Sequence, residues 1–208
     1  DDRRRRRAEV AADEGEVGTF KDRYILQHDP FTLIEAIAIA GWAVGATKAF
    51  LYLRAEYHFL SDLLLNALRQ AKAKGFLEHI EIELREGAGA YICGEESALM
   101  NSIEGMRGEA RYKPPFPPQK GLWGKPTIIN NVETLMNIPS IILKGSAWFR
   151  KMGTERSKGT KVFSVSGDVQ SPGVYELELG SRLSELVSGL ASARDVKMVQ
   201  VGGACGRI

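Results

Sequence analysis

Between residues 29 and 85 the sequence alternates between helical and strand patterns, and this alternation constrains the fold more than any other feature. Asp29 and Pro30 are residue types favoured at a helix start, apolar residues follow them at helical spacing, and Gly45 is the predicted stop. The next segments predict a strand, an amphipathic helix ending at Gly75 and a second strand, at residues 48–57, 61–75 and 79–85. Strands that alternate with helices form a parallel sheet covered by helices, so the predicted fold class is α/β.

The composition is typical of a soluble globular chain and argues against several functions. Of 208 residues, 44% are hydrophobic and 26% are charged, which disfavours disorder. The formal net charge is +2, and Arg3 to Arg7 alone exceed it, so we expect no nucleic-acid partner. The most apolar stretch, residues 31–46, contains Glu35 and is shorter than the ~20 residues that cross a bilayer. Direct membrane insertion is therefore not predicted.

The cysteine and histidine positions predict no metal site in this segment. Cys93 and Cys205 lie far apart without CxxC spacing, which excludes a zinc ribbon or a cluster held by this chain's cysteines alone. The three histidines are scattered along the chain. The cysteine usage fits a reducing compartment.

A change of composition near Gly153 to Gly159 predicts a second, smaller domain. The segments after it follow the order strand, strand, helix, strand, which is typical of a β-grasp domain, at residues 161–167, 173–179, 181–190 and 197–203. We therefore expect three parts: an atypical end, disordered or non-native, at residues 1–11; a first domain at 12–156; and a truncated β-grasp domain at 157–208.

The segment "REGAGAYICGEESALM", residues 85–100, is the first candidate site. Its glycines permit close approach of a ligand to the backbone, but any turn could use them in the same way. Glu95 and Glu96 fall in the first turn of a predicted helix, where the helix dipole favours carboxylates. They point about 100° apart, so one could cap the helix while the other binds a ligand's hydroxyl or amide groups.

Three further segments have both a functional and an ordinary interpretation. Asp13, Glu14 and Glu16 surround Gly15 in a loop that could accept hydrogen bonds, or that could be a plain exposed turn. The proline-rich loop at residues 104–126 could present aromatic and basic side chains to a nucleotide or pack against a partner. In the third segment, Asn130 and Asn131 could serve a site or could be only helix caps, and Asn130 and Glu133 have the spacing of a capping box.

Four segments together resemble one known family. They are "ADEGEVGTFKDRYIL", the block from Gly87 to Leu135, "GSAWFRKMGTE" and "SGDVQSPGVYELELG". They are similar, in the same order, to the flavin-bearing NADH dehydrogenase subunit of respiratory complex I, called the 51-kDa or F subunit. That family includes diaphorase subunits of NAD-linked hydrogenases and formate dehydrogenases. The resemblance implies a partial Rossmann-like FMN domain followed by a β-grasp domain of the soluble-ligand-binding (SLBB) type.

The resemblance also implies an activity and a set of site residues. Such subunits accept hydride from NADH on FMN and pass electrons to iron–sulfur clusters, and no side chain need be catalytic because hydride passes directly between the cofactors. By similarity the flavin ring is lined by Asp13, Glu14, Gly15, Tyr91, Gly94 and Glu95. Glu16 and Glu96 would face NADH, Lys113 and Phe116 would hold its adenine half, and Asn130 and Asn131 would lie near the flavin phosphate and ribityl chain.

The sequence departs from the family pattern at both ends. The family's glycine-rich flavin loop would lie upstream of Asp1, and the four cysteines of its 4Fe-4S cluster would lie beyond Ile208. Arg3 to Arg7 stand where the family has an apolar strand, and Ala11 stands where it has an asparagine. We therefore expect a fragment with an incomplete site, inactive when isolated.

The resemblance also suggests partners and a location. We expect contacts with other subunits of an NADH dehydrogenase complex, especially the small 2Fe-2S subunit. The expected location is cytoplasmic, or peripheral on the cytoplasmic or mitochondrial-matrix face of a membrane. The alternatives are a diaphorase subunit of a hydrogenase or formate dehydrogenase, and a non-catalytic relative that acts as a binding or scaffold module. The terminal electron acceptor and the choice between NADH and NADPH stay open.

Overall fold

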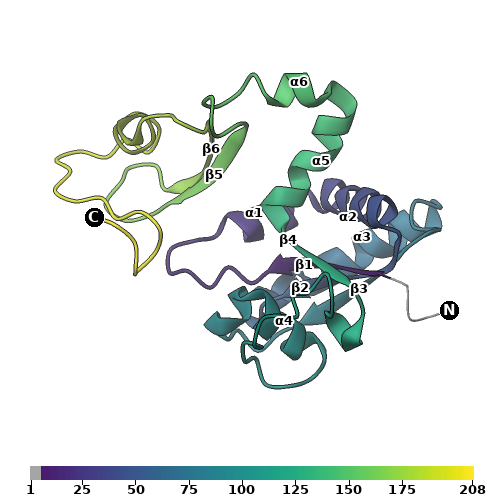
Figure 1. Cartoon of the computed structure of the whole chain (residues 1–208). Helices are drawn as coiled ribbons and strands as arrows, with labels where there is room; N and C mark the ends of the chain where they lie inside the picture. The colour runs from purple at the N-terminus through teal and green to yellow at the C-terminus, as the bar shows by residue number, and fades with distance from the viewer. Residues whose placement is uncertain (1–5) are drawn as a thin grey trace. The chain divides into compact units, whose positions relative to one another are not determined.

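The computed structural model describes residues 6–208, which form two compact units (Figure 1). The first unit contains the chain up to Gly15 together with Ile25–Pro139. The second contains Glu16–Tyr24 together with Ser140–Ile208. The division at Pro139 lies earlier in the chain than the expected boundary after residue 156. Glu16 belongs to the second unit, whereas Asp13 and Glu14 belong to the first.

The first unit contains a four-stranded parallel sheet with the strand order β3-β2-β1-β4. Its strands are β1 (Arg6–Ala12), β2 (Ala46–Leu53), β3 (Glu81–Glu86) and β4 (Thr127–Asn131). In the register, Val10 of β1 lies between Leu51 of β2 and Asn130 of β4. The predicted α/β class with a parallel sheet is confirmed.

Strand β1 corrects the expectation for the start of the chain. Residues 6–11, expected to be irregular, form most of a strand inside the sheet, whereas residues 1–5 lie outside the described residues. The physical reason is that β2 and β4 both pair with β1, so its backbone donors and acceptors are used on both sides whatever side chains it carries.

The helices agree with most of the predicted segments. Helix α2 (Pro30–Val44) starts where predicted: Asp29 Oδ1 accepts a hydrogen bond from the backbone N–H of Thr32 at 3.2 Å. It ends at Gly45, whose φ of 69° is left-handed, as expected for a C-terminal glycine. The other helices are α1 (Lys21–His28), α3 (Ser61–Ala73), α4 (Glu96–Ile103), α5 (Val132–Lys144) and α6 (Ser146–Phe149).

Short helical turns complete the connections. They are η2 (Ala55–Leu60), η3 (Tyr91–Gly94), η4 (Leu122–Gly124) and η5 (Glu185–Leu190). Turn η2 begins two residues after β2 ends, so the strand predicted over residues 48–57 stops at Leu53. The loop at residues 104–126 is irregular apart from η4, as predicted. Among residues 6–208, no helix combines the length and apolar character needed to cross a membrane.

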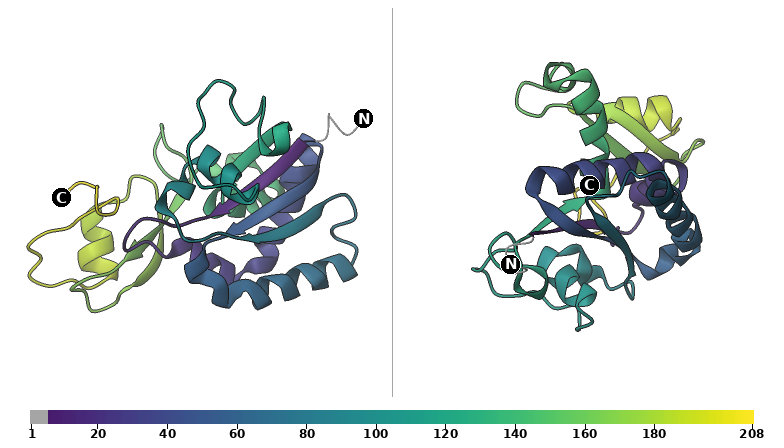
Figure 2. Two further views of the ribbon diagram at one scale, coloured as in Figure 1. Left: turned by 90° about the horizontal axis from the view of Figure 1, so that it is seen from below. Right: turned by 90° about the vertical axis from the view of Figure 1, so that its right-hand side faces the viewer.

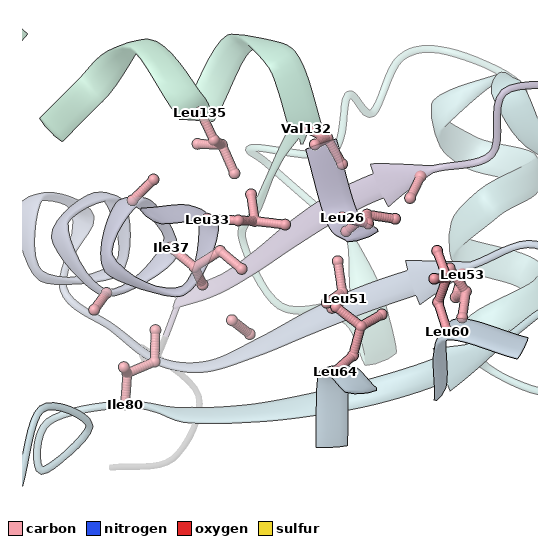
Figure 3. Packing of buried hydrophobic residues seen from close by; sticks show 14 of the residues in the cluster. Leu26, Leu33, Ile37, Leu51, Leu53, Leu60, Leu64, Ile80, Val132 and Leu135 are labelled. Carbon is pink, nitrogen blue, oxygen red and sulfur yellow. The ribbon is translucent and has the colours of Figure 1, made fainter. Parts of the chain in front are cut away.

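Strand β2 is buried on both faces, which explains its nearly continuous apolar sequence. Leu51 and Leu53 point into a cluster that includes residues of α2, α3 and α5, among them Leu33, Leu64 and Leu135 (Figure 3). Phe50 and Tyr52 face the other side, where they pack with Leu99, Met100 and Ile103 of α4. Helices therefore cover both faces of the sheet, and Figure 1 shows α4 opposite α2 and α3.

The second unit contains an antiparallel pair, β5 (Thr160–Val165) and β6 (Gly173–Glu178), followed by η5 (Figure 2). The predicted strand, strand, helix order is confirmed. The prediction of a strand as the fourth element is wrong. Residues 197–203 form no strand, and a single isolated bridge joins Val201 to Arg207. An apolar segment becomes a strand only when a neighbour takes up its backbone hydrogen bonds, and neither β5 nor β6 pairs with this segment.

Candidate functional site

The candidate site lies at the carboxyl edge of the parallel sheet, where the strand order reverses. From β1 the chain continues to β2 on one side, whereas β4 lies on the other side. Asp13 and Glu14 follow β1 directly, and Asn130 and Asn131 end β4. Ala11 pairs with Asn131, so the two segments meet at one edge. Open parallel sheets bind ligands outside this edge, at this reversal.

Asp13 is the least satisfied polar residue at this edge. Its side chain is buried, with 5% exposure, and Oδ2 has no hydrogen-bond partner. Burial raises the pKa of Asp13 from 3.8 to about 7; the Arg54 charge opposes this rise and the Glu56 charge adds to it. A buried polar oxygen without a partner indicates a place where a ligand donor could bind.

Gly94 lies beside this oxygen and leaves room in front of it. A Cβ atom built on Gly94 would meet Asp13 Oδ2 at 3.7 Å, and no other atom is within 4 Å. The other two glycines of the motif, Gly87 and Gly89, lack a side chain for different structural reasons. Gly87 lies against the ring and hydroxyl of Tyr52, where a side chain would clash, and Gly89 has a φ of 78°.

Glu14 is held by two residues that the sequence analysis did not select. Tyr57 donates its hydroxyl hydrogen bond to Glu14 Oε2 at 2.9 Å, and the Arg54 guanidinium donates to the Glu14 carbonyl oxygen. Arg54 also forms a two-point ion pair with Glu56, with Nε to Oε2 at 2.9 Å. One signal could have revealed Arg54, because it directly follows the buried strand β2 at the same edge.

Tyr91 connects the first loop to the glycine-rich motif. A Cβ atom on Gly15 would lie 2.9 Å from Tyr91 Cδ2, so the absence of a side chain at Gly15 permits this contact. The Tyr91 ring remains 61% exposed. The structure therefore brings five of the predicted flavin-site residues to one edge: Asp13, Glu14, Gly15, Tyr91 and Gly94.

Glu95, Glu96 and Lys113 form an ion triad beside them. Lys113 Nζ donates to Glu95 Oε1 at 2.8 Å and to Glu96 Oε1 at 2.5 Å. Glu95 also caps α4, since its Oε2 accepts from the backbone N–H groups of Ser97 and Ala98. Burial disfavours the Glu95 carboxylate, but the hydrogen bonds from Lys113, Ser97 and Ala98 outweigh burial and lower its pKa to about 2.

The remaining predicted residues are arranged less tightly. Asn131 Oδ1 accepts from the Glu133 backbone N–H at 3.0 Å, so Asn131 caps α5 and the capping box predicted for Asn130 is wrong by one residue. Phe116 is 50% exposed in the loop. Glu16 belongs to the second unit, where its carboxylate lies against Gly203. The structure thus does not group Glu16 with Asp13 and Glu14.

Comparison with known proteins identifies the family. The model for the Nuo51 FMN-binding domain matches residues 4–140, and the model for the SLBB domain matches residues 162–203. The chain belongs to the Nuo51 FMN-binding family. Its first domain is thus the flavin domain of this family, and an SLBB domain follows it.

Similar proteins carry related names. The F subunit of the NADH-quinone oxidoreductase of Aquifex aeolicus is 49% identical over 203 residues, which cover 92% of this chain and 48% of the relative. The alpha subunit of the NAD-reducing hydrogenase HoxS of Cupriavidus necator is 46% identical, covering 94% of this chain and 34% of the relative. A crystal structure of an NAD+-reducing NiFe-hydrogenase in the H2-reduced state matches with a TM-score of 0.86 and 45% identity. The match covers 91% of this chain and 33% of the hydrogenase chain. The chain spans half or less of the length of these relatives.

The residues at the edge of the Nuo51 domain fit one part of a flavin nucleotide better than another. Asp13 Oδ2 and the carboxylates of Glu14, Glu95 and Glu96 are hydrogen-bond acceptors, which suit ring N–H groups and sugar hydroxyls. A phosphate would be repelled by these charges, and Lys113 is already paired with two of them. This set of acceptors therefore fits the ring and sugar of a flavin nucleotide, not its phosphate. Among residues 6–208, no cluster of three or more metal-ligating side chains could hold a metal ion.

The ion triad predicts a pH-dependent contribution to stability. Because folding lowers the pKa of Glu95 from 4.5 to about 2, its ionised form stabilises the fold above pH 4.5, and this contribution is lost as pH falls toward 2. Glu95→Gln should therefore lower the free energy of unfolding at pH 7 by about 1 kcal/mol, the size of a lost cap, with solvent screening the ion pair. The difference should shrink toward pH 2. Urea denaturation of both proteins across this range would measure it, and a pH-independent difference would contradict the assignment.

Proposed function

We propose that this chain is part of a flavoprotein subunit that accepts hydride from NADH on FMN and passes the electrons to iron–sulfur clusters. The observation that carries the proposal is the buried, unpartnered Oδ2 of Asp13 beside Gly94, at the reversal point of a parallel sheet. The names of the relatives support the same activity. The substrate, the activity of the whole protein and its partners are parts of this proposal.

The residues have distinct roles in the proposed site. Asp13 accepts a hydrogen bond from the flavin ring or its sugar chain, and Gly94 admits the group next to that carboxyl. Tyr91 is exposed and offers an aromatic surface. Glu96 serves the NADH side, with Lys113 and Phe116 at the adenine half and Asn130 and Asn131 toward the ribityl chain. Bound flavin supplies the hydride acceptor, so the chain's own residues contribute orientation and charge.

The chain's own residues influence the reaction mainly through the negative charge of the site. The carboxylates of Glu14, Glu95 and Glu96, joined by Asp13 when it is ionised, outnumber the nearby cations Arg54 and Lys113. A negative environment disfavours further negative charge on a reduced ligand and weakens the hold on an anionic product. The proposed partners are other subunits of the same complex, especially a small subunit with a 2Fe-2S cluster, and the proposed location is cytoplasmic or peripheral to a membrane.

A chimera would test the proposal. This chain would replace the matching segment of the 49% identical Aquifex aeolicus relative. The chimera is expected to bind FMN and to reduce ferricyanide with NADH at a rate within about tenfold of the parent, since a tenfold change corresponds to only ~1.4 kcal/mol. The isolated chain is expected to bind FMN weakly and to be inactive, because its assigned residues supply acceptors and no free phosphate donor.

The opposite results would count against the proposal in different ways. A folded chimera that binds no flavin would favour a non-catalytic binding or scaffold module. A chimera that binds flavin but oxidises only NADPH, or neither nucleotide, would contradict the proposed substrate. Tight FMN binding by the isolated chain would show that its site is more complete than we propose.

A further inference from the structure

Arg111 lies at the base of the loop at residues 104–126 and contacts helix α4 at several points. Its Nη2 donates to Glu104 Oε2 at 2.6 Å, and its Nε donates to Asn101 Oδ1 at 2.7 Å. Glu104 is only 11% exposed, so this ion pair is shielded from solvent. A planar guanidinium that uses two nitrogens on two partners is fixed in direction as well as in place.

Glu104 joins the two arms of the same loop. Its Oε2 accepts from Arg111 on the first arm, and its Oε1 accepts from the backbone N–H of Trp123 on the second arm at 2.7 Å. The Trp123 ring in turn packs against Phe50 of β2, with centroids 5.3 Å apart. Arg111 and Glu104 therefore close the base of the loop over the sheet.

A second chain of hydrogen bonds runs from Arg111 to the ion triad. The Arg111 backbone N–H donates to Ser97 Oγ at 2.8 Å, and Ser97 Oγ donates to Glu95 Oε2 at 2.5 Å. Lys113 follows Arg111 by two residues and donates to Glu95 and Glu96. The place of Lys113 on its two carboxylates thus depends on where the Arg111 backbone is held.

We propose that Arg111 is a positioning residue of the nicotinamide nucleotide site: it holds the loop so that Lys113 stays between Glu95 and Glu96. Arg111 touches neither cofactor in this role and acts only through Lys113 and Glu95. The expected effect of Arg111 on NADH binding rests on the proposed function, whereas the structural link between Arg111 and Lys113 does not. This difference allows the two to be tested separately.

The first test uses the chain of 208 residues without cofactors. Acetic anhydride labelling at pH 8, read by mass spectrometry, measures the reactivity of the Lys113 amine against that of exposed Lys120. The two carboxylates raise the pKa of Lys113 and accept hydrogen bonds from its amine, so labelling is slow in the parent chain. Arg111→Met is expected to accelerate Lys113 labelling by about threefold or more, and Arg111→Lys should restore part of the protection.

Two further variants separate positioning from general loss of structure. Arg107→Met is the matched control, because Arg107 lies in the same loop but is 88% exposed and pairs with exposed Glu109; it should leave Lys113 labelling unchanged. Glu104→Gln keeps the side-chain size but removes the charged partner of Arg111, and it should accelerate labelling as Arg111→Met does. Unchanged Lys113 reactivity in both Arg111→Met and Glu104→Gln would overturn the proposal, as would equal acceleration at Lys120.

The second test places Arg111→Met and Arg111→Lys in the chimera. A positioning role predicts a KM for NADH raised about tenfold with kcat changed less than about twofold, and an intermediate KM for Arg111→Lys. An equal fall of kcat with unchanged KM would contradict that role. If the unsubstituted chimera did not oxidise NADH, the proposed function would fail, and the labelling result would still decide the link between Arg111 and Lys113.

Discussion

Asp13→Asn is expected to stabilise the folded chain at pH 8.5 by on the order of 2 to 4 kcal/mol and to change its stability little at pH 3.5. The reason is that burial raises the pKa of Asp13 from 3.8 to about 7. Below pH 3.8 the carboxyl is protonated in both the folded and the unfolded chain, so the substitution removes no charge. As pH rises from 3.8 through 7, the parent must either keep a proton or bury a carboxylate without a partner, and its stability falls relative to the variant.

Urea denaturation of the two proteins at pH 3.5 and pH 8.5 would measure this difference. Asp168→Asn is the matched control, because it makes the same substitution at an exposed site. A stability difference that is the same at both pH values would mean that Asp13 is solvated in the folded chain.

The same substitution should have the opposite effect on ligand binding. In the chimera, Asp13→Asn is expected to weaken FMN binding by about 10 to 100-fold, the range for a hydrogen bond to a charged acceptor. Flavin fluorescence titration would measure the affinity. Gain of stability together with loss of affinity is typical of a residue retained for function at the expense of stability. Unchanged FMN affinity would exclude Asp13 from the flavin site.

Leu64→Ala is expected to lower the free energy of unfolding by about 2 to 5 kcal/mol. Leu64 is 1% exposed and packs in the cluster of Leu51 and Leu53 between α3 and the sheet, as Figure 3 shows. Removing its branched end leaves a cavity that a helix held against a sheet fills only in part. Such a loss is a large share of the stability of a domain of this size.

The next residue along the helix provides the control for that experiment. Leu65 is 44% exposed on the same helix, so Leu65→Ala should cost less than about 1 kcal/mol. Both variants change leucine to alanine in α3 and alter helix propensity equally. Equal losses in urea denaturation would show that α3 does not bury Leu64 against the sheet in solution.

Much of the first unit could be predicted from the sequence because its signals are local. Helix α2 begins after Asp29 and ends before Gly45 as expected, since a side-chain cap and a left-handed glycine act within one turn. Strand β1 could not be predicted, because "RRAEVAA" lacks a strand pattern and is a strand through its two neighbours. The reverse holds for residues 197–203, whose apolar pattern predicts a strand but which lack a ladder partner among the described residues.

The candidate site shows the same division. The sequence singled out Glu95 and Glu96 at a helix start and expected one of them to cap it, and Glu95 does so. It did not reveal that Lys113, 17 residues after Glu96, joins both carboxylates. Tyr57 was missed because its contact with Glu14, 43 residues away, has no local signal. Arg54 was missed because the strand was predicted to continue to residue 57, whereas β2 ends at Leu53 and Arg54 follows it at the sheet edge.

By itself the sequence determined the family, the α/β class, the candidate carboxylates and the starts of helices α2, α3 and α4, because these depend on residue type, spacing and contacts within a few residues. Only the tertiary structure decided that β1 lies between β2 and β4, and so that Asp13 and Asn131 share one edge. It also decided that Asp13 keeps an unpartnered buried oxygen and that Glu16 belongs to another unit. Burial and pairing depend on segments far apart in the chain, and local sequence patterns do not encode which of those segments meet.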